Sequence, residues 1–213
     1  MEIEFLGANC FRIKTKATTI VVDDNLSKIG GKSIQSEKTT GFYTSADVEN
    51  GVKSASRLLI DSPGEFEVGD VTVTGVQARA HMDEEGKESA TVFQFMYNGQ
   101  TVTVLGHVHP DVSAAVLELV GGTDALIVPV GGNGFTLDPA GAASLIKKTE
   151  PGAVIPSQYE IKGLNYEVPA QPLEEFSKLM SSTDNEPQDS YKLAKTDDLS
   201  SQTRVVVLKK LDK

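Results

Sequence analysis

Two short, unbroken apolar runs in the second half of the chain constrain its fold more than any other feature. One lies within "DALIVPVG" (residues 124–131) and the other within "AVIPSQY" (residues 153–159). A strand whose apolar residues follow one another without alternation is typical of a strand buried on both faces, as in a parallel sheet. A sheet of this kind needs a covering layer of helices, so the two runs predict a mixed α/β architecture.

Helical patterns flank these runs, as that architecture requires. Residues 110–120 have apolar side chains at helical spacing, and residues 172–182 form a third helical candidate. Between them, residues 138–151 predict a helix with Asp138 as its N-cap and Pro139 at its first position, which is the preferred place for proline in a helix. The second half of the chain therefore alternates strands with helices.

The first half has the alternating pattern of antiparallel strands. Apolar and polar residues alternate in "EIEFLG", and the turn "NG" separates "ATVFQFMY" from "QTVTVLGH", which is a strong hairpin signal. We interpret residues 25–41 as an exposed loop and residues 62–70 as a turn, and we expect residues 203–211 to form a closing strand. Strands outnumber helices in this reading of the chain.

Charge and cysteine content exclude several classes of function. The 213 residues carry a formal net charge of −10, which disfavours nucleic acid and anionic membranes as partners. Cys10 is the single cysteine, so no internal disulfide forms, and this fits a reducing compartment. No apolar run reaches membrane-spanning length and the N-terminal residues do not resemble a signal peptide, so we expect a cytoplasmic protein.

All three histidines follow strand-like runs. His107 and His109 stand in "VLGHVHP", and His81 closes "TVTGVQARAH". Histidines at this spacing and at strand ends are a common arrangement of metal ligands in metalloenzymes. The pattern leaves open whether these histidines bind a metal or hydrogen-bond to neighbouring polar groups in a loop.

Several motifs, in order along nearly the whole chain, resemble those of the metallo-β-lactamase-fold hydrolases, in the branch with lactonase-like and uncharacterised metal-dependent members. The segments that carry the resemblance are "EIEFLGANCFRI", "TIVVDD", "SPGEFEVGDVTVTGVQARAH", "VLGHVHP", "DALIVPVGG", "EPGAVIPSQY" and "DDLSSQTRVVVL". The resemblance implies a four-layer αββα sandwich, formed by one domain over residues 1–213. It also implies a cleft at the ends of the strands, where family members hold one or two divalent metals, usually zinc.

The chain departs from the family at most metal-ligand positions. The family's His-x-His-x-Asp-His motif falls on "TSADVENG", and the family's lone histidine is kept as His81. Its bridging aspartate is replaced by His107, its final histidine by Gln158, and an early histidine by Ala8. The resemblance thus implies a vestigial cleft, whose members are Ser45, Asp47, Glu49, Asn50, His81, His107 and Gln158.

One metal site is still compatible with these residues. His81, His107 and either Asp47 or Glu49 would supply two imidazoles and a carboxylate, a set that suits iron, manganese or zinc. The alternative is that His107 pairs with a carboxylate left without its metal. Ser45 is not surrounded by a G-x-S-x-G elbow, which argues against a serine hydrolase.

These observations predict a non-catalytic member of the fold that binds a small molecule or a protein, with no cofactor, because several ligands are lost together. The alternative is a divergent metal-dependent hydrolase with a rebuilt mononuclear site. A nucleic-acid-processing member is disfavoured by the acidic charge, and by the absence of the large inserted domain found in the nuclease branch.

Overall fold

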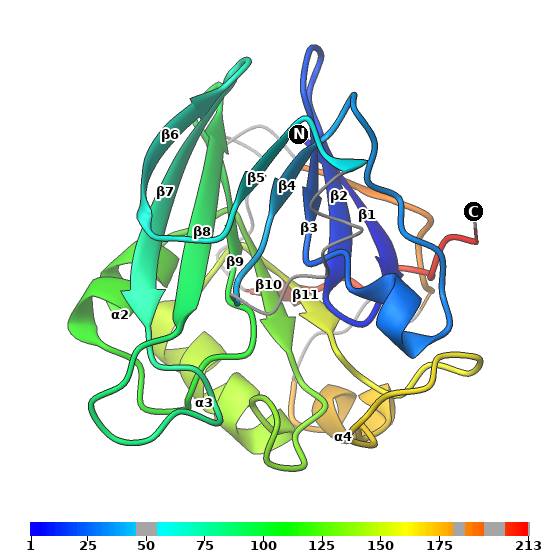
Figure 1. Ribbon diagram of the computed structural model, residues 1–213. Helices are drawn as coiled ribbons and strands as arrows, with labels where there is room; N and C mark the ends of the chain where they lie inside the picture. The colour runs from blue at the N-terminus through cyan, green and yellow to red at the C-terminus, as the bar shows by residue number, and fades with distance from the viewer. Residues whose placement is uncertain (46–54, 181–185, 194–202, 213) are drawn as a thin grey trace.

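The computed structural model describes residues 1–45, 55–180, 186–193 and 203–212. In these residues two mixed β-sheets lie face to face, and helices flank the sandwich (Figure 1). This architecture confirms the predicted α/β sandwich of the metallo-β-lactamase type.

The first sheet is built mainly from the N-terminal strands. Its order among the described residues is β12-β1-β2-β3-β4-β5, in which β3, β4 and β5 run parallel and the other neighbours antiparallel. A 3₁₀ helix, η1 (Leu26–Ile29), follows β3. The strands are β1 (Glu2–Gly7), β2 (Cys10–Lys14), β3 (Thr19–Val22), β4 (Thr40–Phe42), β5 (Leu58–Ile60) and β12 (Tyr191–Lys192).

The second sheet combines the predicted hairpins with the parallel strands. Its order in the described part of the chain is β13-β11-β10-β9-β8-β7-β6, antiparallel from β6 to β9 and parallel from β9 to β13. The strands are β6 (Gly64–Val68), β7 (Val71–Ala78), β8 (Ala90–Tyr97), β9 (Gln100–Val104), β10 (Ala125–Pro129), β11 (Ala153–Ser157) and β13 (Arg204–Val205). Every residue of β10 and β11 is buried, as the unbroken apolar runs predicted.

The helices alternate with these parallel strands. Helix α2 (Ala114–Val120) is capped by the Ser113 side chain, and α3 (Pro139–Thr149) by the predicted Asp138, which accepts a hydrogen bond from the Gly141 amide. Helix α4 (Leu173–Ser177) is shorter than the helix predicted over residues 172–182. No helix in the described ranges combines the length and the hydropathy needed to cross a membrane.

Local signals were correct at some turns and wrong at others. Asn98 and Gly99 both have positive φ and join β8 to β9, which confirms the predicted hairpin. The segment expected to be a turn at residues 62–70 contains β6, and the expected loop at residues 25–41 contains η1 and the start of β4. The predicted closing strand is limited to Arg204–Val205, because the chain after it makes only isolated bridges.

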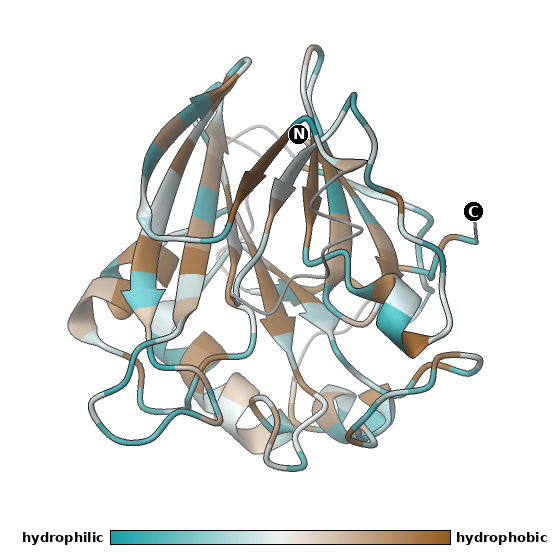
Figure 2. Ribbon diagram, viewed as in Figure 1, coloured by the Kyte–Doolittle hydropathy of each residue, from teal (hydrophilic) through white to brown (hydrophobic). Residues whose placement is uncertain are grey.

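The largely aliphatic core between the sheets contains a cluster of aromatic rings. Phe42 of the first sheet packs edge-on against Phe93 and Phe95 of the second sheet, with ring centroids 5.2 and 5.0 Å apart. Figure 2 shows apolar residues (brown) along the strands, interrupted by polar ones (teal). Alternation explains this packing, since Ile3 and Phe5 of β1 are fully buried while the intervening Glu2 and Glu4 face away from the core.

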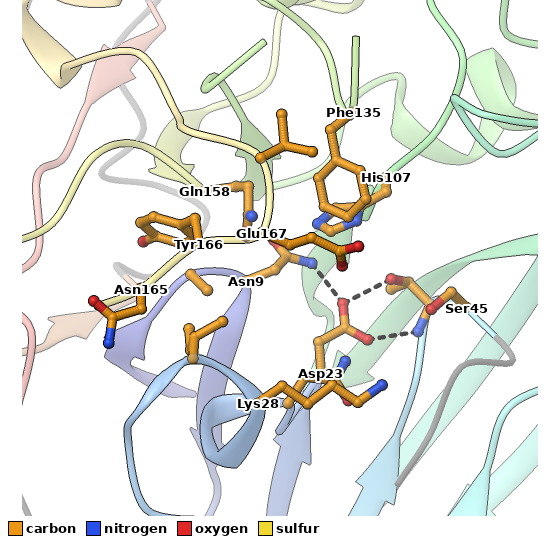
Figure 3. A pocket seen from close by; sticks show the side chains of 15 residues that line it. Asn9, Asp23, Lys28, Ser45, His107, Phe135, Gln158, Asn165, Tyr166 and Glu167 are labelled. Carbon is orange, nitrogen blue, oxygen red and sulfur yellow. Dashed lines mark hydrogen bonds between the residues drawn. The ribbon is translucent and has the colours of Figure 1, made fainter. Parts of the chain in front are cut away.

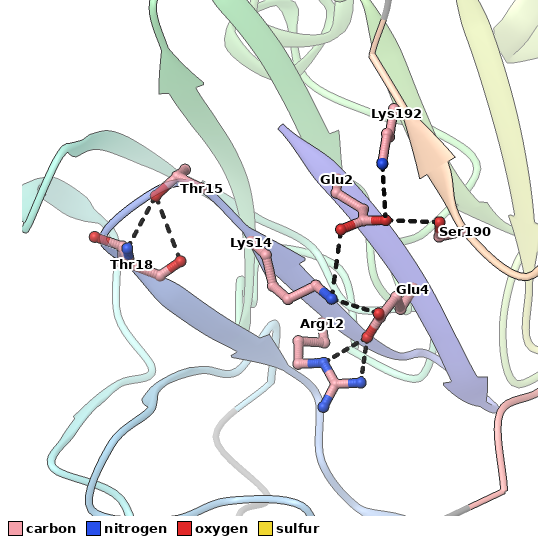
Figure 4. Close-up of polar contacts among 8 residues, drawn as sticks. All are labelled: Glu2, Glu4, Arg12, Lys14, Thr15, Thr18, Ser190 and Lys192. Atoms are coloured by element: carbon pink, nitrogen blue, oxygen red, sulfur yellow. Dashed lines mark hydrogen bonds and ion pairs between the residues drawn. The ribbon is translucent and has the colours of Figure 1, made fainter.

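A cluster of charges covers the opposite face of β1 and β2. Arg12 and Lys14 form ion pairs with Glu4, while Lys14 and Lys192 reach Glu2 at 3.4 and 4.0 Å (Figure 4). The Ser190 hydroxyl also donates to Glu2, at 2.8 Å. These contacts tie β12, near the end of the chain, to the first strand.

Candidate functional site

A cavity of about 390 Å³ opens between the ends of the two sheets. Side chains from many separate segments point into it, as Figure 3 shows. Its lining residues are Ala8, Asn9, Asp23, Asn25, Lys28, Ile29, Thr44, Ser45, His107, Phe135, Gln158, Asn165, Tyr166, Glu167 and Val168.

Strand direction explains why distant residues meet here. Asp23 and Thr44 follow β3 and β4, which run parallel in the first sheet. His107 and Gln158 follow β9 and β11, which belong to the parallel part of the second sheet. The carboxyl ends of parallel strands meet at one sheet edge, and ligand sites of α/β proteins commonly form there.

A buried hydrogen-bond chain forms the floor of the cavity. The two oxygens of the Asp23 carboxylate accept bonds from the Thr44 amide (2.7 Å), the Thr44 hydroxyl (2.6 Å) and the Asn9 side-chain amide (2.5 Å). The Asn9 oxygen accepts in turn from the Ser157 hydroxyl at 2.6 Å. Burial raises the pKa of Asp23 to about 6, although these donors oppose the shift. This chain connects the first sheet to the second.

Asn9 and Asp23 were not predicted as site residues from the sequence. The available signal was the apolar strand that ends in Asp23, since a carboxylate at a strand end marks the sheet edge where sites form. Asn9 left no such signal, because its partners lie 14 and 148 residues away in the sequence.

Strained backbone is concentrated around the same cavity. Ala8, Asp23 and Gln158 have φ values of 52°, 47° and 52°, and they are three of the six non-glycine residues with positive φ among those described. The Gln158 amide donates to the Ala8 carbonyl at 2.7 Å, so two of these residues hold each other in place. Non-glycine residues in this conformation cost free energy and tend to cluster at functional sites.

His107 occupies the cavity wall opposite Asp23. Its ring packs edge-on against Phe135, with centroids 4.7 Å apart, and its Nε2 atom is buried without a hydrogen-bond partner in the described residues. Burial lowers the pKa of His107 to about 4, against a smaller opposing effect of the Gln158 side chain. His107 is therefore a neutral imidazole at neutral pH.

The other two histidines lie beside the cavity. The His81 amide donates to the His107 carbonyl at 2.8 Å, but His81 is not among the described lining residues. Burial lowers the pKa of His81, and its Nδ1 atom has no partner in the part of the chain that the structure describes. The His109 ring lies 6.0 Å from that of His81, and its Nδ1 accepts a bond from the Asp111 amide.

The structure places some residues of the predicted cleft at the cavity, and others lie outside the described residues. Ser45, His107 and Gln158 line the cavity, and His81 adjoins it through the backbone. The predicted Asp47, Glu49 and Asn50 lie in residues 46–54, outside the described part of the chain. The expected pairing of His107 with Asp47 or Glu49 therefore stays a prediction.

The described residues do not fit a metal ion. Within the four described ranges, no group of three or more His, Cys, Asp and Glu residues is placed to hold one. Asp23 is committed to three hydrogen bonds, and His81 and His107 together supply two ligands where zinc sites use at least three. Ser45 and Gln158 offer only weak, neutral oxygen or nitrogen atoms in addition.

Comparisons with known proteins agree with the fold. Residues 2–158 match the family model described as the beta-lactamase superfamily domain. A structure described as a "putative zn-dependent hydrolase of the metallo-beta-lactamase superfamily" from Thermotoga maritima has a TM-score of 0.72 and 24% identity, over 97% of each chain.

Two further structures are similar at lower identity. Igni18, a metallo hydrolase from Ignicoccus hospitalis, has a TM-score of 0.58 and 16% identity, over 84% of this chain and 89% of that chain. The metallo-beta-lactamase fold protein YhfI from Bacillus subtilis has a TM-score of 0.58 and 10% identity, over 98% and 95%. A comparison with curated proteins gives no match.

Proposed function

We propose that this chain, which belongs to the beta-lactamase superfamily of metal-dependent hydrolases, is a non-catalytic member of it. Its cavity would bind a small molecule without a metal ion. In this proposal the family's metal cleft has become a polar binding site. The fold still brings the same strand ends together, and hydrogen bonds replace the metal as the means of holding them.

The hydrogen bonding of Asp23 is the observation that carries this proposal. Its carboxylate lies on the cavity floor, yet an amide, a hydroxyl and a side-chain amide already donate to it. A cation that took this carboxylate as a ligand would have to displace buried hydrogen bonds, which is costly because the freed donors would be left without partners. With Ser45 and Gln158 where the resemblance implies histidines, the described cleft offers fewer ligands for a water-activating metal than the family's sites have.

The strained backbone supports a site that binds a ligand over a former metal site that has lost all function. Positive φ at Ala8, Asp23 and Gln158 disfavours folding unless something else requires this geometry. A cavity that had lost every role would gain stability by relaxing these residues. A requirement to bind a ligand would explain why these strained conformations are retained.

The test is the metal content of the purified protein together with its hydrolytic activity. We expect well under one equivalent of zinc per chain by elemental analysis. We also expect no hydrolysis of chromogenic esters, lactones or β-lactams, with or without added zinc. About two tightly held zinc ions, or an activity that chelator removes, would overturn the proposal.

A second candidate function is a hydrolase with a rebuilt mononuclear site of His81, His107 and Asp47 or Glu49. Two buried ring nitrogens favour it, since Nδ1 of His81 and Nε2 of His107 have no partner among the described residues. Bound to these atoms, a divalent metal would supply a Lewis acid and lower the pKa of bound water.

Thermal unfolding with and without chelator distinguishes the two candidates. The rebuilt site predicts that chelator lowers the melting temperature of the wild type and leaves His107→Ala unaffected. His109→Ala serves as the control, because its ring accepts a bond from the Asp111 amide and lies outside the proposed ligand set. A chelator response that is equal in all three proteins would exclude the rebuilt site.

A further inference from the structure

We propose that the cavity selects a small, uncharged, polyhydroxylated molecule of the size of a monosaccharide or a nucleoside. This inference rests on the proposed binding function and adds the chemical class of the ligand.

Uncharged polar groups dominate the lining. Of the fifteen lining residues, eight have side chains that form hydrogen bonds without carrying a charge at neutral pH. Amides, hydroxyls and an imidazole of this kind both donate and accept, which suits hydroxyl groups that do the same. The eight are Asn9, Asn25, Thr44, Ser45, His107, Gln158, Asn165 and Tyr166, of which Asn9 and Thr44 already donate to Asp23.

The charged residues of the lining do not form an anion site. Asp23 is covered by its three hydrogen bonds on the floor. Lys28 and Glu167 are both exposed and have opposite charges (Figure 3). Phosphate and carboxylate sites typically gather several lysine or arginine donors, and Lys28 is the single such residue among the described lining residues. A ligand with a full negative charge would therefore gain little from this cavity and would approach the Asp23 and Glu167 carboxylates.

The volume of the cavity and the aromatic side chains in its wall suit a ligand that contains a ring. A volume of about 390 Å³ lies near the lower end of the range of about 300–1,000 Å³ for small-molecule pockets. Phe135 and Tyr166 place two aromatic rings in the lining, and the contact with His107 holds Phe135 in position. An aromatic face packs against the C–H face of a sugar or against a nucleobase.

Isothermal titration calorimetry with matched neutral and phosphorylated compounds tests the proposal. The probes are D-glucose against glucose 6-phosphate, and inosine against inosine 5′-monophosphate. We expect at least one neutral compound to bind about tenfold more tightly than its phosphorylated partner. The glucose and inosine arms distinguish a free sugar from a nucleoside.

Two phenylalanine variants supply the matched control. Phe135→Ala removes an aromatic wall and should weaken binding of the neutral compound about tenfold, as expected for a lost aromatic contact. Phe66→Ala makes the same change in β6, a strand that contributes nothing to the described lining, and should leave binding unchanged. Equal effects of the two variants would place the ligand elsewhere.

Two outcomes would overturn the ligand class. One is tighter binding of the phosphorylated compounds, and the other is no detectable binding of either neutral compound at millimolar concentration. Both leave the zinc content and the hydrolysis assays untouched, so a failure of the ligand class is distinguishable from a failure of the proposed non-catalytic function.

Discussion

Asp23 and His107 should make opposite contributions to the pH dependence of stability. The pKa of Asp23 rises from 3.8 to about 6 on folding, so the folded protein binds more protons than the unfolded chain between these values. Stability from this group is fully present at low pH and is lost as the pH rises through about 6. The pKa of His107 falls from 6.5 to about 4, so its contribution rises over nearly the same range.

The magnitudes follow from the two shifts. At about 1.4 kcal/mol per pKa unit, Asp23 lowers the free energy of unfolding by about 2 kcal/mol between pH 4 and pH 7. His107 raises it by at most about 3 kcal/mol over the same interval, and by less where water reaches the partly exposed ring. In the wild type the two contributions nearly cancel. Each single variant therefore shows the pH dependence that the remaining residue contributes.

Urea unfolding at pH 4, 5, 6 and 7 measures the free energy of unfolding of the wild type, Asp23→Asn, His107→Asn and the double variant. Relative to the wild type, Asp23→Asn should be most destabilised at pH 4 and should recover by about 2 kcal/mol at pH 7. His107→Asn should change in the opposite direction, and the double variant should follow the wild type in slope. A constant offset between Asp23→Asn and the wild type at every pH would refute the reasoning.

Five further variants, two of them controls, test the backbone and the histidine loop by urea unfolding. Ala8→Gly should change the free energy of unfolding by less than about 0.5 kcal/mol because φ is 52°, whereas Ala78→Gly in β7 should cost more than about 1 kcal/mol. Gly106→Ala should cost several times more than Gly86→Ala, since its added Cβ would lie 2.3 Å from a threonine hydroxyl oxygen while the Gly86 site is open. His109→Ala should cost less than about 1 kcal/mol, because its described hydrogen bond stays within its own loop. The opposite order within either pair, or a large loss at His109, would contradict these assignments.

Much of the fold was predictable because its signals are local or repeat along the chain. The turn at Asn98 and Gly99 and the helix start at Asp138 each depend on a few adjacent residues. Strand β6 was missed because "SPG" indicates a turn, while the strand owes its existence to pairing with β7 across the sheet. Tertiary contacts decide such segments, and local propensity does not record them.

The candidate site was predictable only in part. The resemblance to a known fold placed Ser45, His107 and Gln158 at positions that line the cavity. The buried pair of Asn9 and Asp23 was not anticipated, because the apolar strand before Asp23 indicates only a sheet edge and nothing in the sequence indicates Asn9 as its partner. Polar networks of this kind are visible only in three dimensions.

The pairing of β1 with β12 has a consequence for synthesis of the protein. Residues 2 and 3 pair with residues 192 and 191, so the outer edge of β1 stays open until about 190 further residues have been translated. At about 5–20 residues per second this takes roughly 10–40 s, during which an unpaired strand edge is exposed to other nascent chains. Glu2 and Glu4 place negative charge along β1 while this edge is unpaired. Strand β12, which then pairs with the edge, carries Lys192, a partner of opposite charge for Glu2.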